Sequence, residues 1–211
     1  MNRTITSGIL ALLLMPPSGW AQAQAAPWYL SLDGGAALVP DSSVDYGGGA
    51  APSRALKFQT GWGVVGTAGW EVHPSFRLEA QVGYTRNGVR SISPGASPSG
   101  SASATTTMLV GRWRWPNQSH VVPFLELGGG RAWVAQNLVV GGTTLSNTSA
   151  STWAYQAAVG AYIPFAERFD LDLSYRYLGT QRGIFLDNNF LLYQSSFASH
   201  AVLVGLTWRV R

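Results

Sequence analysis

Two pairs of histidine and serine have the residue types and spacing that come closest to nucleophilic chemistry in this chain. His73 lies two residues before Ser75, and His200 directly follows Ser199. Acyl transfer needs a base, a nucleophile and an acid that orients the base, and neither pair supplies this set. Neighbouring residues of a strand point to opposite faces, which would separate Ser199 from His200. We interpret His73 as a turn residue and His200 as a polar residue near a membrane interface.

Paired carboxylates are the second group that could do chemistry. Asp170 and Asp172 are two residues apart, and Glu79 and Glu126 lie in two other apolar-alternating stretches. Such pairs can act as general acid and base, so catalysis by them is one alternative. The sequence offers neither a cluster of metal ligands nor a phosphate-binding loop, and we interpret glycines 128–130 as loop or strand-bend residues. We therefore expect no metal and no cofactor.

Alternation of apolar and polar residues is the strongest structural signal around these groups. In residues 76–84 (FRLEAQVGY) every second residue is apolar or aromatic, and the residues between them are charged, polar or glycine. The stretches 169–177 (FDLDLSYRY) and 202–210 (VLVGLTWRV) repeat this pattern. A period of two predicts strands with one apolar and one polar face.

The gaps between these stretches alternate in length. Short gaps centre on His73-Pro74, Pro116-Asn117 and Pro164-Phe165. Long gaps, rich in Gly, Ser, Ala and Asn, lie near 40–55, 88–104, 136–151 and 180–196. Tight turns on one side and long loops on the other are typical of outer-membrane barrels. We predict an all-β fold, an eight-stranded antiparallel up-and-down transmembrane β-barrel over residues 26–211, with both termini in the periplasm.

Charged residues fall on the polar face of the predicted strands, which would line the barrel interior. An eight-stranded barrel is just wide enough for its side chains to fill it, so we expect arginines and carboxylates to pair across strands as a structural core. The open alternatives are catalytic carboxylates and a charge-lined transport path. The inward set comprises Asp33, Lys57, Glu71, Arg77, Glu79, Arg112, Arg114, Glu126, Asp170, Asp172, Arg176 and Arg209.

Aromatic residues gather near the predicted strand ends. Barrels carry aromatic girdles at both membrane interfaces. The short-turn side has Trp28, Trp70, Phe76, Trp115, Phe169 and Trp208, and the long-loop side has Phe58, Tyr84, Trp133, Trp153, Tyr177 and Phe197.

Composition and the N-terminus agree with export to a membrane. Residues 1–25 combine Arg3, an apolar run at 9–15 and small-residue cleavage sites, so we expect a cleaved signal peptide. Charged residues are only 11%, against about a quarter in soluble domains. After the leader, no apolar run is long enough for a membrane-spanning helix. Basic residues are spread along the chain, which argues against nucleic-acid binding.

The fourth long gap differs from the others because it is apolar. We consider two interpretations: a hairpin extension that turns at residues 187–189, and an exposed patch that contacts a partner. The residues concerned are Ile184, Phe185, Leu186, Phe190, Leu191, Leu192 and Tyr193.

The stretches 76–84 and 170–177 and the closing 200–209 resemble the OmpA-like porin family, over the whole region after the leader. The resemblance implies outer-membrane residence in a Gram-negative bacterium, contact with membrane lipid and lipopolysaccharide, and assembly by the barrel-assembly machinery. It also implies roles in envelope integrity or in adhesion to a host or surface ligand. Two departures stand out: Val210 and Arg211 replace the usual terminal aromatic residue, and no peptidoglycan-binding domain is expected. A narrow porin-like channel and a lipid A-modifying enzyme remain as alternatives.

Overall fold

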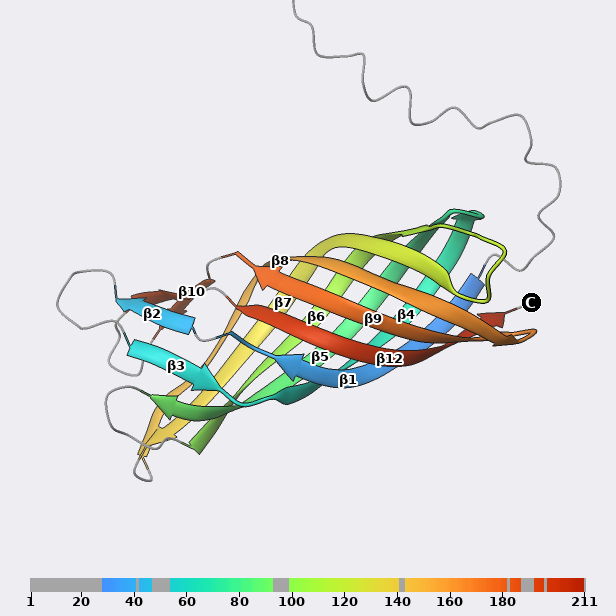
Figure 1. Cartoon of the computed structure of the whole chain (residues 1–211). Coiled ribbons are helices and arrows are strands. Elements are labelled where there is room, and N and C mark those ends of the chain that lie inside the picture. The colour runs from blue at the N-terminus through green and yellow to red at the C-terminus, as the bar shows by residue number, and fades with distance from the viewer. Residues whose placement is uncertain are drawn as a thin grey trace, which may run out of the picture.

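The computed structural model describes residues 28–40, 42–46, 54–92, 99–140, 143–181, 183–186, 192–195 and 197–210. Its elements are strands throughout (Figure 1). In four short strands only the backbone is described. The predicted signal peptide lies outside the described residues. Within the described residues there is no helix of the length and apolar character needed to cross a membrane.

Eight long strands, called the barrel strands here, form the wall, and four short ones, the loop strands, lie beyond one end (Figure 1). The barrel strands are β1 (Trp28–Leu38), β4 (Gly61–His73), β5 (Phe76–Ile92), β6 (Ser99–Arg114), β7 (Val122–Val140), β8 (Thr143–Ala166), β9 (Phe169–Thr180) and β12 (Ala198–Val210). The loop strands are β2 (Ser42–Tyr46), β3 (Arg54–Phe58), β10 (Gly183–Leu186) and β11 (Leu192–Ser195).

The barrel strands close into a ring in which each strand pairs antiparallel with two others. The order is β5-β4-β1-β12-β9-β8-β7-β6, and β6 returns to β5. The first and last barrel strands are neighbours, with Trp28 opposite Val210 and Leu38 opposite His200. The predicted fold class, an eight-stranded antiparallel up-and-down barrel, is therefore confirmed.

One end of the barrel carries the short turns, and β1 begins and β12 ends there (Figure 1). Residues 74–75, 115–121 and 167–168 make these turns. The predicted turn centre at Pro164-Phe165 is wrong, because β8 continues to Ala166 and the turn lies at 167–168. Proline lacks an N–H but is tolerated at a bulge, and the register shifts between Pro164 and Ala166.

Two of the predicted long loops are in fact mostly strand. Strand β5 continues to Ile92 and β6 begins at Ser99, which shortens the predicted gap at 88–104. Strand β7 continues to Val140 and β8 begins at Thr143, so the gap at 136–151 is also shorter than predicted. Small polar residues have weak strand propensity, but the ladder from Ser99 opposite Val139 to Ser103 opposite Ala135 pairs their backbones.

The other two long gaps, around 40–55 and 180–196, hold the loop strands, which pair with each other. They form the order β10-β11-β2-β3, and β3 joins the extension of β5. Two predictions change here, because Lys57 and Phe58 belong to β3 while the barrel strand begins at Gly61. Lys57 is therefore not an interior charge of the barrel, and Phe58 is not an interface aromatic residue of the barrel wall.

Exposure alternates along the barrel strands as the sequence predicts. Arg77, Glu79 and Gln81 are buried on β5, whereas Leu78 and Val82 between them are exposed. Most of the aromatic residues predicted for the two ends lie outward, among them Trp28, Trp70, Trp115, Trp133, Trp153 and Trp208. The eight strands therefore present an apolar outer wall.

Phe197 is an exception to the predicted aromatic girdle. Its side chain is buried among interior residues that include Met108, Val134 and Leu178. It shares odd parity with Ser199 and Leu203, which are also buried. The period of two, rather than nearness to a strand end, therefore decides its direction.

Glycines 128–130 lie within β7, not in a loop, and they differ in the room around them. A Cβ built on Gly130 would lie 2.0 Å from the Thr107 carbonyl oxygen of β6. A Cβ on Gly129 would meet only the Ala154 carbonyl oxygen, at 3.9 Å. Strands β6 and β7 thus approach closely at Gly130.

We predict that Gly130→Ala destabilises the barrel by about 1–3 kcal/mol, the usual cost of overpacking, whereas Gly129→Ala leaves stability nearly unchanged. Reversible urea unfolding in lipid vesicles, followed by tryptophan fluorescence, measures both. Equal unfolding free energies for the two neighbouring variants would contradict the close approach of β6.

Candidate functional site: the charged interior and the loop strands

The Arg112 guanidinium is the centre of the barrel interior. Its Nε lies 2.8 Å from Glu79 Oε1, one terminal nitrogen lies 3.1 Å from Asp172 Oδ2, and the other pairs with Glu126. These carboxylates come from β5, β9 and β7, and all four side chains are at most 3% exposed. The inward rows of four strands thus meet on one cation, because their register brings these positions to the same level.

Neutral polar groups extend this cluster across the barrel. The Tyr29 hydroxyl of β1 donates to Glu79 Oε1, and Gln81 Nε2 donates to Glu79 Oε2 at 2.7 Å. Gln156 of β8 then donates to Gln81 Oε1 at 2.8 Å. Beneath the central cation, the Phe124 ring centroid lies 4.3 Å from Arg112 Cζ. Hydrogen bonds to the buried carboxylates offset part of the cost of their desolvation.

Two further ion-pair groups lie toward the short-turn end. Glu71 accepts from Arg77 at 3.2 Å and pairs with Arg114 at 2.7 Å. Arg209 makes a two-point contact with the carboxylate of Asp170, with Nε 3.0 Å from Oδ2. These two groups contain five of the eight predicted inward residues outside the Arg112 cluster. The other three are Asp33, Arg176 and Lys57, and Lys57 lies in β3 rather than in the barrel wall.

Asp33 and Arg176 are held less tightly than the rest. Asp33 accepts from Ser31 Oγ at 3.0 Å and lies over Gly205, but among the described residues no basic group comes within ion-pair distance of it. The sequence predicts an arginine partner, which the structure does not supply. Arg176 reaches Glu126 Oε2 at 3.6 Å.

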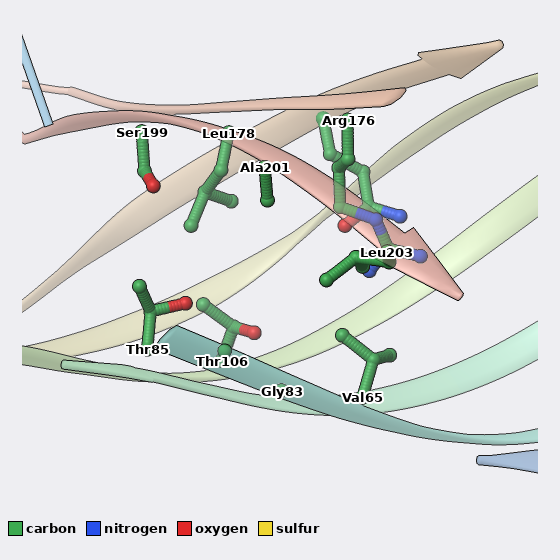
Figure 2. Close-up of a pocket in the computed structure, with 11 residues that line it drawn as sticks. Val65, Gly83, Thr85, Thr106, Arg176, Leu178, Ser199, Ala201 and Leu203 are labelled. Carbon is green, nitrogen blue, oxygen red and sulfur yellow. The ribbon is translucent and has the colours of Figure 1, made fainter. Parts of the chain in front are cut away.

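A small cavity borders Arg176 on its side toward the loop strands. Figure 2 shows Arg176, Leu178, Ser199, Ala201 and Leu203 facing Val65, Thr85 and Thr106 across it. Its volume is about 30 Å³, counting only the positions that the centre of a water molecule can take. A cavity of that size has room for about two waters. It is far smaller than a diffusion pathway.

Among the described residues, the half of the interior toward the loop strands is uncharged: its buried side chains are apolar, or polar without charge such as Asn87, Thr152 and Ser199. It contains a buried cluster formed by Ala104, Met108, Val110, Ala132, Val134, Ala154, Leu178 and Phe197. The described interior therefore changes from ion pairs near the short turns to uncharged side chains near the loops.

Neither histidine–serine pair is arranged as a base and a nucleophile, and the candidate carboxylates meet on arginines. His73 Nδ1 accepts from the Ser75 backbone N–H at 3.1 Å within an exposed turn. His200 lies on the outer wall, with Nδ1 2.6 Å from the Tyr175 hydroxyl, whereas Ser199 is buried inside. The four paired carboxylates are those that hold Arg112 and Arg209. Within the described ranges, no three His, Asp or Glu residues are grouped to hold a metal ion.

The fourth gap contains an antiparallel hairpin of β10 and β11. Ile184 lies opposite Gln194, Phe185 opposite Tyr193 and Leu186 opposite Leu192. Strand β11 also pairs with β2, with Tyr193 opposite Tyr46. Phe190, Leu191 and the predicted turn at 187–189 lie outside the described residues.

Sequence reasoning missed several uncharged residues of the interior. Tyr29, Phe124 and Tyr162 contribute rings beside Arg77, Arg112 and Arg114. The period of two could have identified these rings. Tyr29 and Phe124 lie an even number of residues from Asp33 and Glu126 on their own strands, and Tyr162 does so from Asp170 across a tight hairpin. Large apolar rings are easily assigned to the lipid face by their chemistry alone.

Comparisons with known proteins agree with this architecture. The family model described as "Outer membrane protein beta-barrel domain" matches residues 7–209. Among curated proteins, no sequence matches the chain.

Three solved structures resemble the fold. OprG from Pseudomonas aeruginosa has 11% identity over 88% of this chain and 98% of its own, with a TM-score of 0.61. Neisserial surface protein A has 17% identity over 89% and 100%, with a TM-score of 0.52. The outer-membrane protease OmpT from Escherichia coli has 10% identity over 90% and 99%, with a TM-score of 0.51. At these identities the likeness shows the fold alone.

We predict that Arg112→Met destabilises the barrel by about 3–5 kcal/mol, because it leaves buried carboxylates without their cation. Urea unfolding in lipid vesicles measures the loss. The matched control is Arg168→Gln, which removes an exposed arginine of the turn between β8 and β9 and should change stability by less than about 0.5 kcal/mol. Equal effects of the two substitutions would contradict the central role of Arg112.

Proposed function

Because the chain belongs to the outer membrane protein β-barrel family and is located in the outer membrane, we propose that it is a non-enzymatic envelope protein. In this proposal its loop strands make surface contacts, and the barrel supports envelope integrity. The observation that carries the proposal is that side chains fill the interior around Arg112. In the proposal, the loop end is then the part of the protein available for contacts outside the cell.

The proposed orientation places the short turns in the periplasm and the loop strands outside the cell. Barrels of this class have short periplasmic turns and longer extracellular loops. The turns at 74–75 and 167–168 contrast with the 39–60 connection at the other end, which supports this orientation. Residues 1–25 act as a cleaved signal peptide in the proposal, and the barrel-assembly machinery inserts the remainder.

The proposal of a non-enzymatic role rests on geometry. His200 and Ser199 are on opposite faces of β12. His73 is engaged with its own turn. The carboxylates with the right chemistry are at most 2% exposed and are paired with arginines. A Ser–His mechanism would need a base and a nucleophile within hydrogen-bond reach.

A narrow channel is the alternative that the charged interior favours, and ion pairing argues against it. We predict no steady conductance when homogeneous protein is reconstituted in planar lipid bilayers, because the interior charges are paired and the cavity beside Arg176 is small. Arg176→Ala should weaken the barrel without opening a large pore. Frequent, reproducible and long-lived conductance steps from the unaltered protein would overturn the closed interior.

The loop strands give surface contact a structural basis. Backbone pairing from β10 through β11, β2 and β3 to β5 joins the first and fourth connections into one small sheet. Apolar residues lie on it at Ile184, Phe185, Leu186 and Leu192. A sheet that carries apolar residues suits contact with another molecule better than an isolated loop does.

We predict that deletion of 184–193 reduces binding of cells to host or abiotic surfaces while the barrel still folds. Below the deletion, Thr180 N–H donates to the Phe197 carbonyl at 2.9 Å and closes the β9–β12 hairpin. Cell-adhesion counts measure binding, and heat-modifiable gel migration measures folding. Deletion of 93–98, in the connection between β5 and β6, is the matched control.

Two outcomes separate the parts of the proposal. Equal adhesion by both deletion variants and the unaltered protein would remove the surface-contact role. If cells lacking the whole protein then leak periplasmic contents, the structural role in the envelope accounts for the function.

A further inference from the structure

Charges on the outer wall of the barrel are few and of one sign. Among the described side chains, the outward rows of the barrel strands contain no carboxylate. Their charged residues are Arg86 on β5 and Arg131 on β7, both toward the loop end. All six carboxylates of these strands belong to the inward rows described above. Arginine on the lipid face is costly near the bilayer midplane and is tolerated near the interfaces, so we expect these two positions to lie near an interface.

Arg131 is held in place by its neighbours without being neutralised by them. One terminal nitrogen donates to Ser151 Oγ at 3.1 Å, and Cζ lies 5.1 Å from the ring centroid of Trp153. Trp153 lies directly opposite Arg131 in the β7–β8 ladder, and Trp133 is the next outward residue of β7. Guanidinium carries five N–H donors, so Ser151 uses a small part of its capacity.

The aromatic neighbours fix the depth of this arginine. Trp133 and Trp153 are exposed on the outer wall, at 46% and 58% of their surfaces, and tryptophan prefers the level of the lipid headgroups. Arg86 lies in a similar setting, opposite Trp62 in the ladder, and Trp62 packs on Tyr84 with ring centroids 5.5 Å apart. Both cations are therefore at the headgroup level of the leaflet next to the loops.

We propose that Arg131 binds a phosphate group of lipopolysaccharide in the outer leaflet, with Arg86 as a second, more exposed contact. Arginine pairs with phosphate through parallel N–H donors, and an outer wall that carries cations but no carboxylate is complementary to an anionic headgroup layer. A water-soluble protein partner fits less well, because Arg131 lies between two tryptophans of the wall. The inference rests on the proposed orientation with the loop end outward.

The test compares how much lipopolysaccharide the intact, detergent-extracted barrel binds. Purified lipopolysaccharide is the probe, and native mass spectrometry measures the bound lipid. We expect Arg131→Gln to weaken binding about tenfold, the loss expected for one charge-assisted contact. Arg86→Gln should have a smaller effect, and Arg131→Lys should keep part of the affinity because lysine also binds phosphate. Arg168→Gln, at the opposite end, is the matched control and should bind normally.

Removal of the phosphates from the probe gives the decisive comparison. Dephosphorylated lipopolysaccharide should bind the unaltered protein at least as weakly as the intact lipid binds Arg131→Gln, because the Arg86 contact is lost as well. If Arg131→Gln retains the intact lipid normally, or if dephosphorylation has no effect, the inference is wrong. A lowered unfolding temperature of Arg131→Gln with unchanged lipid binding would assign Arg131 to packing on Trp153 alone.

A separate measurement tests the orientation on which the inference rests. The chain contains no cysteine, so Asn137→Cys, at an exposed position near the loop end of β7, provides a single labelling site. A membrane-impermeant maleimide should label it on intact cells. Absence of labelling would overturn the orientation, whereas labelling together with unchanged lipid binding would overturn only the phosphate contact.

Discussion

Closure of eight antiparallel strands leaves an interior just wide enough for side chains to fill it, and the rest of the molecule is arranged around this limit. Large inward side chains are accommodated where a neighbouring strand has glycine. A Cβ on Gly69 would lie 2.1 Å from the Tyr29 ring, and one on Gly160 would lie 2.5 Å from the Phe124 ring. The rings beside Arg77 and Arg112 therefore occupy the space that a side chain at these inward glycines would fill.

The buried ion pairs do more to determine the register of the barrel strands than to increase the stability of the fold. Buried ion pairs often add little net stability, because desolvation offsets their attraction. A slip of one residue, however, would turn Arg112 and Glu126 toward lipid and their apolar neighbours inward. An arginine on the lipid face costs about 2–4 kcal/mol at the midplane, and a carboxylate costs less. Several strands carry such charges, so an incorrect register would expose more than one of them.

Properties that depend on one strand were predictable from the sequence, and properties that depend on two strands were less so. The period of two assigned Arg77, Glu79 and Asp172 to the interior, because side-chain direction alternates locally. The absence of a described arginine partner for Asp33 was not predictable, since it depends on how other strands align with β1; its hydrogen-bond donor, Ser31, lies on the same strand. The ends of β5 to β8 were also misjudged, because pairing extends strands through Ser- and Gly-rich sequence that has little propensity of its own.

Phe197 shows how a chemical class can mislead where periodicity does not. An aromatic residue at a strand end fits an interface girdle, yet parity with Ser199 and Leu203 places it inside. There it joins the buried apolar cluster of the loop half, whereas Arg112 and its carboxylates occupy the other half. Ion pairs fill one half of the described interior and uncharged side chains fill the other, and this filling supports the proposal that the barrel is not a channel. In that proposal the specific contacts come from the outer wall and the loop strands, because the interior side chains are already engaged with one another.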